Sequence, residues 1–264
     1  MTRAAGAGAV RFTEYVALGD SMSIDLYPAL DAGDTDVAVA LEWDAKVGRV
    51  APLGAASLLF RNVDDRYPEF TGRDLASGFP GVTHANLCED GATIGDVFGF
   101  QLPQFASGDA ETLVTLSVGG NDLLSAFASR PEPALLTHVV RDIADAWEFL
   151  VESVMRARPN ATLLVTTVYD PSDGTRAIPG LFDAAGPLPL ESLNDLNDRV
   201  RAIAAATRGC RVADAHRHFL GHGVSATHDA DRWYWKRSWI EPGAAGASEL
   251  RRLWLDALAA NAEN

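Results

Sequence analysis

Short apolar runs alternate with longer amphipathic stretches along this chain, and this alternation constrains the fold more than any other feature. Strand–helix alternation predicts parallel strands joined by right-handed crossovers, with helices on both faces of the sheet. We therefore expect an α/β protein with a doubly wound parallel sheet of about five strands. The expected strands, rich in Val, Thr and Leu, are residues 15–18, 82–88, 112–118, 162–169 and 210–213. The expected helices are residues 51–62, 94–105, 134–155, 190–207 and 247–260.

The chain shows no boundary between domains. No internal repeat, low-complexity block or Pro/Gly/Ser-rich linker interrupts its 264 residues. We expect a single domain over residues 1–264. One segment stands out within it, the acidic stretch 25–44, which carries Asp31, Asp34, Asp36 and Glu42. Charge runs are usually solvated, so we favour a solvent-facing excursion over the alternative, a lid beside the functional site.

Composition excludes several classes of function. Lys and Arg number 22 against 36 Asp and Glu, which gives a net charge of −14 and argues against nucleic acid or an anionic membrane as partner. No apolar run approaches the ~18–20 residues that a membrane span needs. The N-terminus lacks a leucine-rich signal segment, so we expect a cytoplasmic location. Two cysteines and no His-Glu-x-x-His spacing indicate neither a disulfide scaffold nor a metal site, and we expect no cofactor.

Small and polar residues follow three of the expected strands. In open parallel sheets, ligands bind outside the carboxyl ends of the strands. There Ser21 offers a hydroxyl at a strand-to-helix turn, Gly91 has a backbone N–H that a substrate can approach closely, and Asn121 has a side-chain amide donor. A serine nucleophile with such N–H donors has the composition of an oxyanion hole.

These three blocks resemble the SGNH/GDSL hydrolases. Gly-Asp-Ser-Met at 19–22, Asn-Leu-Cys-Glu-Asp-Gly-Ala-Thr at 86–93 and Gly-Gly-Asn-Asp at 119–122 are similar to the family's serine, glycine and asparagine blocks. The resemblance spans about residues 15–258. It implies a three-layer, flavodoxin-like sheet of order 2-1-3-4-5 and hydrolysis of an ester or acetyl group through an acyl-enzyme on Ser21. The substrate would be a small-molecule ester or an acylated carbohydrate.

The fourth block departs from the family pattern. The family usually carries Asp-x-x-His followed by Pro, whereas this chain has Ser238-Trp-Ile-Glu241-Pro242. Pro242 and Gly246 keep the frame, Glu241 occupies the histidine position and Ser238 the aspartate position. The usual Ser-His-Asp arrangement is therefore missing from its ordinary place.

Three interpretations of this departure remain open. Glu241 itself takes the proton from Ser21; or a histidine from the 216–228 loop does, with Glu241 orienting it; or the site binds without turnover. His222 is the preferred histidine because its glycine neighbours allow close approach, ahead of His216, His218 and His228. An inactive binding domain and an acyltransferase to a carbohydrate are therefore the alternatives to a hydrolase. We also expect Asp20 and Asp122 to brace turns, and Trp233, Tyr234, Trp235 and Trp239 to pack the last loop against the core.

Overall fold

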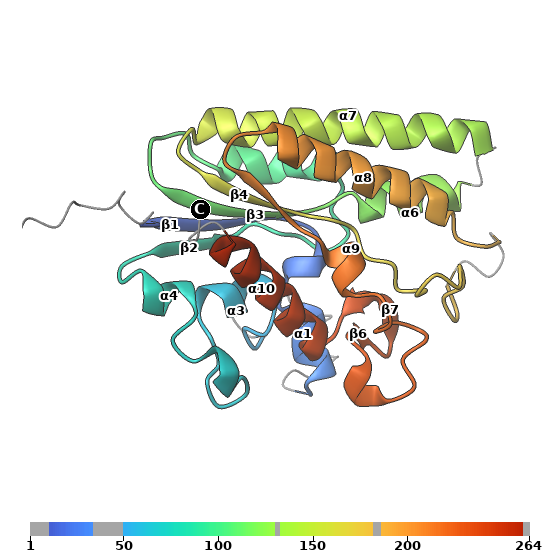
Figure 1. The fold of residues 1–264 in the computed structure, drawn as a ribbon, viewed down its shortest axis with the longest axis horizontal. Coiled ribbons are helices and arrows are strands. Elements are labelled where there is room, and N and C mark those ends of the chain that lie inside the picture. Colours follow the sequence, from blue (N-terminus) through green and yellow to red (C-terminus); the bar gives the residue numbers. More distant parts are fainter. Residues whose placement is uncertain (1–10, 34–49, 130–132, 182–185, 261–264) are drawn as a thin grey trace, which may run out of the picture.

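The computed structural model describes residues 11–33, 50–129, 133–181 and 186–260. Five strands form one parallel sheet in the order β2-β1-β3-β4-β5, which confirms the expected fold class and strand order (Figure 1). Neighbouring strands are in register through the centre of the sheet, where Leu18 pairs with Leu116 and Leu116 with Val165. The strands are β1 (Glu14–Gly19), β2 (Thr83–Asn86), β3 (Thr112–Ser117), β4 (Thr162–Thr166) and β5 (Cys210–Ala213).

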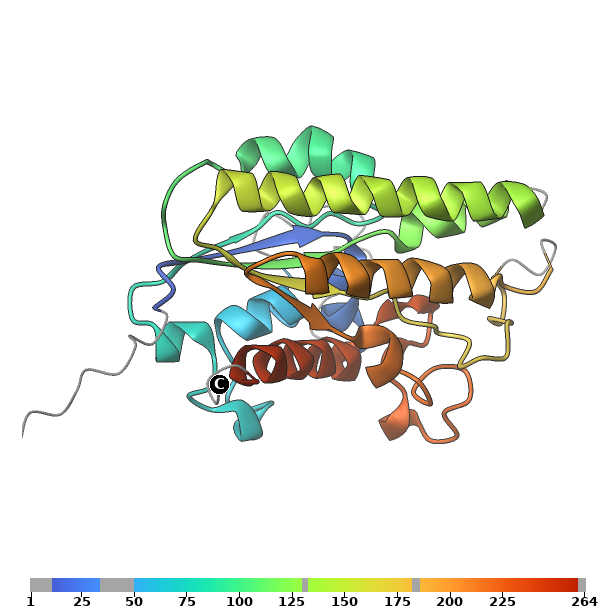
Figure 2. The ribbon, with the colours of Figure 1, turned by 45° about the horizontal axis from the view of Figure 1, so that its top comes forward.

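Helices cover both faces of this sheet, as Figures 1 and 2 show. One face carries α6 (Gly120–Ala128), α7 (Pro133–Ala157) and α8 (Leu190–Ala206). The other carries α3 (Ala55–Phe60), α4 (Leu75–Gly78) and α10 (Ala244–Ala259). The short helices α1 (Leu26–Asp31) and α9 (Ala215–His218) lie near a separate hairpin of β6 (Tyr234–Trp235) and β7 (Ser238–Pro242).

The two faces of the sheet bury two separate apolar clusters. Successive side chains of a strand point to opposite faces, so Tyr15 and Ala17 join the cluster beneath α10 while Val16 and Leu18 join the one beneath α7. Fully buried tryptophans anchor the two clusters, Trp254 from α10 and Trp147 from α7. Burial on both faces fixes the strand ends, and with them the turns that carry the candidate site.

One predicted helix is broken. Residues 94–105 form α5 (Ile94–Asp96), a π-helical turn η4 (Val97–Gln101) and a 3₁₀ turn η5 (Leu102–Gln104) instead of a continuous helix. The π turn ends at Gln101, whose buried side chain hydrogen-bonds to the backbone of Gly19. A tertiary contact thus overrides the helical periodicity, and π turns are frequent where a side chain is aimed at a functional site. The expected helix 51–62 is shorter in the structure. Its N-cap residue is Gly54, and α3 ends at Phe60.

The acidic segment is only partly within the described residues. Asp25 accepts hydrogen bonds from Gly54 N (2.8 Å) and Ser57 Oγ (3.0 Å), and Asp31 accepts one from Ala244 N (2.9 Å). The half-buried Asp25 therefore ties α1 to α3, whereas Asp31 is exposed, as the solvent-facing interpretation predicts. Asp34, Asp36 and Glu42 lie outside the described residues. Among the helices that the structure describes, none is long and apolar enough to cross a membrane.

Candidate active site

Ser21 lies in the turn that follows β1. It begins the short 3₁₀ turn η1 (Ser21–Ser23), and Asp20 caps that turn by accepting a hydrogen bond from Met22 N at 3.1 Å. Gly19 precedes the turn at a φ of 136°, and a Cβ there would lie 1.9 Å from the carbonyl oxygen of Ser117 on β3. Only glycine fits this contact, so the path of the backbone requires the glycine that precedes Asp20 and Ser21.

Gln101 supports the same turn from the helical layer. Its amide oxygen accepts from Gly19 N at 2.8 Å and its amide nitrogen donates to Gly19 O at 2.7 Å. The side chain is 1% exposed, so both bonds form away from solvent. This residue was absent from the expected site. Its only signal in the sequence is a polar residue within an otherwise apolar helical pattern.

The glycine and asparagine blocks are tied to each other. The Asn121 side chain donates from Nδ2 to Ala92 O at 3.0 Å, directly after Gly91, whose φ is 69°. Asp122 accepts from Ile94 N at 3.2 Å, which adds a second link. The amide nitrogen of the Asn121 side chain carries two hydrogens. One bonds to Ala92 O, so the other is available to a ligand. Asp20 and Asp122 therefore brace turns, as expected.

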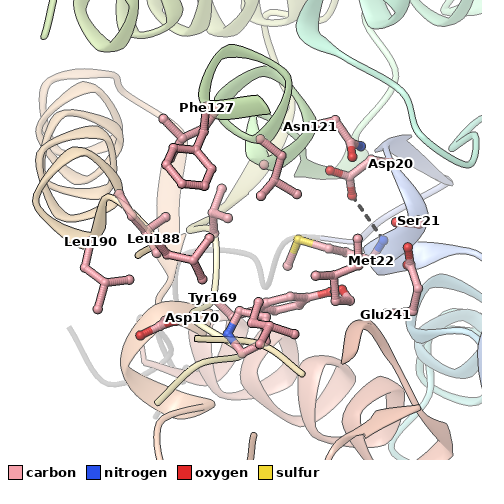
Figure 3. Close-up of a pocket in the computed structure, with 18 of the residues that line it drawn as sticks. Asp20, Ser21, Met22, Asn121, Phe127, Tyr169, Asp170, Leu188, Leu190 and Glu241 are labelled. Atoms are coloured by element: carbon pink, nitrogen blue, oxygen red, sulfur yellow. Dashed lines mark hydrogen bonds between the residues drawn. The ribbon is translucent and has the colours of Figure 1, made fainter. Parts of the chain in front are cut away.

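Glu241 reaches the site from β7. It is 7% exposed, and its Oε2 atom has no hydrogen-bond partner among the residues that the structure describes. Burial raises the pKa of Glu241 to about 7; the interaction with the Ser21 hydroxyl lowers it, and the negative charge of Asp90 raises it. Figure 3 shows the carboxyl group beside Ser21. The structure therefore brings a carboxyl group with a near-neutral pKa to the serine.

Further acidic and phenolic groups surround this carboxyl. Burial also raises the pKa of Asp20 well above its ordinary value, and Glu241 adds to that rise. Asp90 accepts a hydrogen bond from the Tyr27 hydroxyl at 2.8 Å. The Tyr169 hydroxyl donates to Ile240 O at 2.6 Å and so holds the strand that carries Glu241. The titratable groups next to Glu241 are therefore the carboxyl groups of Asp20 and Asp90 and the phenols of Tyr27 and Tyr169.

Ser21, Asn121 and Glu241 line one pocket together, and Gly91 is joined to it through the Asn121–Ala92 bond. The pocket contains about 740 Å³ of empty space, its open mouth included. Figure 3 shows Asp20, Ser21, Asn121 and Glu241 at one end, whereas Asp170 lies toward Leu188 and Leu190 at the other end. The apolar lining comprises Met22, Leu123, Leu124, Phe127, Val168, Ile178, Leu188, Leu190, Leu193 and Ile240.

The structure does not bring His222 to this pocket. Its ring stacks on Trp233, with centroids 3.5 Å apart, and its Nδ1 atom lies 2.7 Å from Asp231 O. The carboxylate of Asp173 holds the flanking glycines by accepting from Gly221 N and Gly223 N, each at 2.9 Å. His216, His218 and His228 are likewise absent from the lining residues.

The aromatic residues before Glu241 pack the last loop, as expected. Tyr234 is buried against Tyr169 and Phe219, and Trp233 contacts Phe219 at 5.0 Å between ring centroids. None of Trp233, Tyr234, Trp235 and Trp239 is among the residues that line the pocket. Aliphatic residues from other segments form its walls instead.

Comparison with solved structures gives the same fold. An extracellular lipase from Streptomyces rimosus aligns with a TM-score of 0.56 at 20% identity, over 93% of this chain and 99% of that one. Phospholipase A1 from Streptomyces albidoflavus aligns at 0.59 and 19%, over 94% and 98% of the two chains. An acetylxylan esterase from Geobacillus stearothermophilus aligns at 0.57 and 12%, over 95% of each. At such identities the likeness shows the fold alone.

The sequence itself assigns the family. None of the curated protein sequences compared with this chain matches it. A family model, however, covers residues 17–248, from the strand before Ser21 to the helix after Glu241. The match therefore includes all four blocks, the altered fourth one among them. On this match, the chain belongs to the GDSL-like lipase/acylhydrolase family and is an ester-acting hydrolase by family.

Proposed function

We propose that this protein hydrolyses carboxylic esters through an acyl-enzyme on Ser21, with Glu241 as the general base. The observation that carries the proposal is the buried carboxyl group beside the serine, whose pKa is raised to about 7. An ordinary glutamate is about two pH units less basic than histidine, whereas this one matches an imidazole. General bases are most effective when their pKa lies near the working pH.

The first half-reaction follows from this arrangement. Glu241 takes the proton of the Ser21 hydroxyl as Oγ forms a bond to the ester carbonyl carbon. The negative charge then develops on the carbonyl oxygen, which the free Asn121 amide hydrogen and the backbone N–H groups of Ser21 and Gly91 stabilise. The C–O bond to the alcohol breaks, and protonated Glu241 gives its proton to the departing oxygen.

Water completes the cycle. Glu241, again ionised, takes a proton from a water molecule that attacks the acyl-enzyme carbonyl. The same donors stabilise the second oxyanion. Collapse of this intermediate breaks the bond to Ser21 Oγ, which recovers its proton from Glu241, and the carboxylic acid leaves. The base thus acts in both half-reactions, as a histidine does in other serine hydrolases.

A pH–rate profile with two serine variants tests this proposal. The ionised form of Glu241 is active, so kcat/KM for a neutral ester should rise with pH through an inflection near 7. Ser21→Ala should reduce kcat by about 10⁴-fold or more at pH 8. Ser125→Ala, an exposed serine on α6, is the matched control and should keep wild-type activity.

Two results would contradict the proposal. Ser21→Ala that keeps a tenth of wild-type turnover would exclude the serine as nucleophile. If His222→Ala lost activity while Glu241→Gln stayed fully active, the general base would be a histidine of the 216–228 loop and not Glu241. An enzyme that turns over an ester faster with a sugar acceptor than with water would instead be the acyltransferase.

A further inference from the structure

We propose that the pocket beside Ser21 binds an uncharged, apolar acyl chain, so that the preferred substrates are neutral esters of medium-length fatty acids and not acetyl esters. The inference rests on the proposed function, because it takes Ser21 as the point where the acyl group is attached. It goes further by naming the class of acyl group and the side chains that select it.

The side chains that line the pocket are the first evidence for an apolar acyl chain. From Ser21 the cavity runs between α6, which contributes Leu123 and Phe127, and the segment before and within α8, which contributes Leu188, Leu190 and Leu193. Figure 3 shows Phe127, Leu188 and Leu190 around the same space. A wall of this kind offers no hydrogen-bond partners to a sugar hydroxyl, but it removes alkyl groups from water.

The position of Glu241 decides which part of the ester enters. The base must reach the oxygen of the leaving alcohol, and it lies beside Ser21 at one end of the cavity. Phe127, Leu188 and Leu190 lie at the other end, away from Glu241 (Figure 3). With the carbonyl oxygen at Asn121 and the alcohol at Glu241, the group that extends toward Leu190 is the acyl chain.

The charged residues that line the pocket restrict the class of acyl chain further. The charged residues among the described lining are all acidic: Asp20, Asp170 and Glu241. Asp170 is saturated by the backbone N–H groups of Ser172 and Gly174 and by the Ser172 hydroxyl. An anionic acyl chain would therefore lose its hydration without gaining a cation among the described lining residues. The pocket favours chains that end in a methyl group.

A pair of isomeric esters tests the direction of binding. Ethyl octanoate and octyl acetate have the same formula, but the long chain is in the acyl part of the first and in the alcohol of the second. We expect kcat/KM for ethyl octanoate to exceed that for octyl acetate by at least about 100-fold, since each methylene removed from water contributes up to about fourfold. Equal rates, or preference for octyl acetate, would overturn this inference while Ser21-dependent hydrolysis preserved the proposed function.

A variant of the wall tests which residues select the chain. Leu190→Trp fills the far end of the pocket and should lower the ratio of kcat/KM for ethyl octanoate to kcat/KM for ethyl acetate at least tenfold. Leu135→Trp, on an exposed position of α7, is the control and should change neither. Should Leu190→Trp fail to fold, Phe127→Ala enlarges the cavity and should move the optimum to longer acyl chains. An unchanged chain-length profile in the folded variants contradicts the assignment.

A charged analogue tests the last step. Methyl octanoate and monomethyl suberate differ in the end of the acyl chain, a methyl group in the first and a carboxylate in the second. At pH 8 we expect monomethyl suberate to react at least about 100-fold more slowly. Comparable rates would overturn the charge argument. Hydrolysis of every ester at the same rate by Ser21→Ala would mean that both the proposed function and this inference fail.

Discussion

The two parts of the candidate site are built differently. Ser21 and Asn121 lie on turns that continue directly from central strands of the five-stranded sheet, and Gly19 and Gln101 fix the first turn with two buried hydrogen bonds. Glu241 lies on a separate two-stranded hairpin, β6–β7. The Tyr169–Ile240 hydrogen bond and the Gly243 N to Trp233 O bond hold that hairpin in place.

This difference matches what each part has to do. A nucleophile and its oxyanion donors act through geometry, and errors of about 1 Å are costly. A general base acts through its pKa as well, and a pKa depends on burial and on nearby charge. In the proposed mechanism the buried turns hold the nucleophile and the oxyanion donors, and the hairpin holds a carboxyl group whose pKa burial raises to about 7.

After loss of the serine itself, the largest expected effect is the loss of the proposed base. Glu241→Gln keeps the size of the side chain but cannot accept the serine proton, so kcat should fall about 10²–10⁴-fold at pH 8. Steady-state kinetics on a neutral ester measures the loss. Glu152→Gln, an exposed position on α7, is the matched control and should be fully active.

The same variant should be more stable than the wild type above pH 7. The folded pKa of Glu241, about 7, lies above the unfolded value of 4.5, so the folded state binds more protons between these pH values and wild-type stability falls as pH rises through this window. The cost at pH 8 is about 3 kcal/mol at most. Urea unfolding of both proteins at pH 5 and pH 8 measures it. Equal stability at pH 8 would show that the carboxylate is not destabilised by burial.

Loss of an oxyanion donor ranks next. Asn121→Ala removes the amide that faces the pocket and should lower kcat about 10²–10³-fold with little change in KM, because the donor acts on charge that develops in the transition state. The Asn121–Ala92 bond is lost as well, so a thermal melt of the variant must accompany the kinetics. Wild-type kcat with a raised KM would make Asn121 a contact of the ground state.

A variant of the buried glutamine tests the rigidity of the serine turn. Gln101→Ala leaves Gly19 N without its partner, whereas Gly19 O keeps the bond from Glu89 N at 3.1 Å, so the free energy of unfolding should fall by about 1–3 kcal/mol. Gln104→Ala is the control, since its side chain makes one exposed bond to Phe100 O and should change stability by less than about 0.5 kcal/mol. If both variants are equally stable, the π turn does not support the site.

The sequence predicted all five strands because the signals there are local, although the expected strands 82–88 and 162–169 end earlier, at Asn86 and Thr166. An apolar run followed by glycine and a polar residue requires a turn at the carboxyl edge of a sheet, and Ser21 and Asn121 were found in this way. Gln101 escaped prediction because its partner, Gly19, is 82 residues away in sequence. No local pattern carries such a contact.

The proposed base was harder to predict for a similar reason. Glycine neighbours made His222 look accessible, yet those glycines serve the Asp173 carboxylate and the imidazole ring stacks on Trp233. Glu241 was found from the family frame alone. Its near-neutral pKa depends on burial by segments distant in sequence, so a sequence cannot distinguish it from an ordinary exposed glutamate.

The smallest expected effect concerns the neighbour of the base. The charge of Asp90 raises the pKa of Glu241, so Asp90→Asn should move the acidic limb of the pH–rate profile to lower pH. Asp90 is exposed, and salt screens exposed charges, so the shift should be a fraction of a pH unit and kcat at pH 8 should stay within about twofold of wild type. Added salt should move the limb in the wild type and less in the variant. Asp109→Asn, at the opposite end of β3, should leave it in place. If the acidic limb instead moved to higher pH in Asp90→Asn, the Asp90 carboxylate would stabilise ionised Glu241 through the geometry of its turn. The Glu241 hairpin would then depend on fixed contacts as much as the serine turn does.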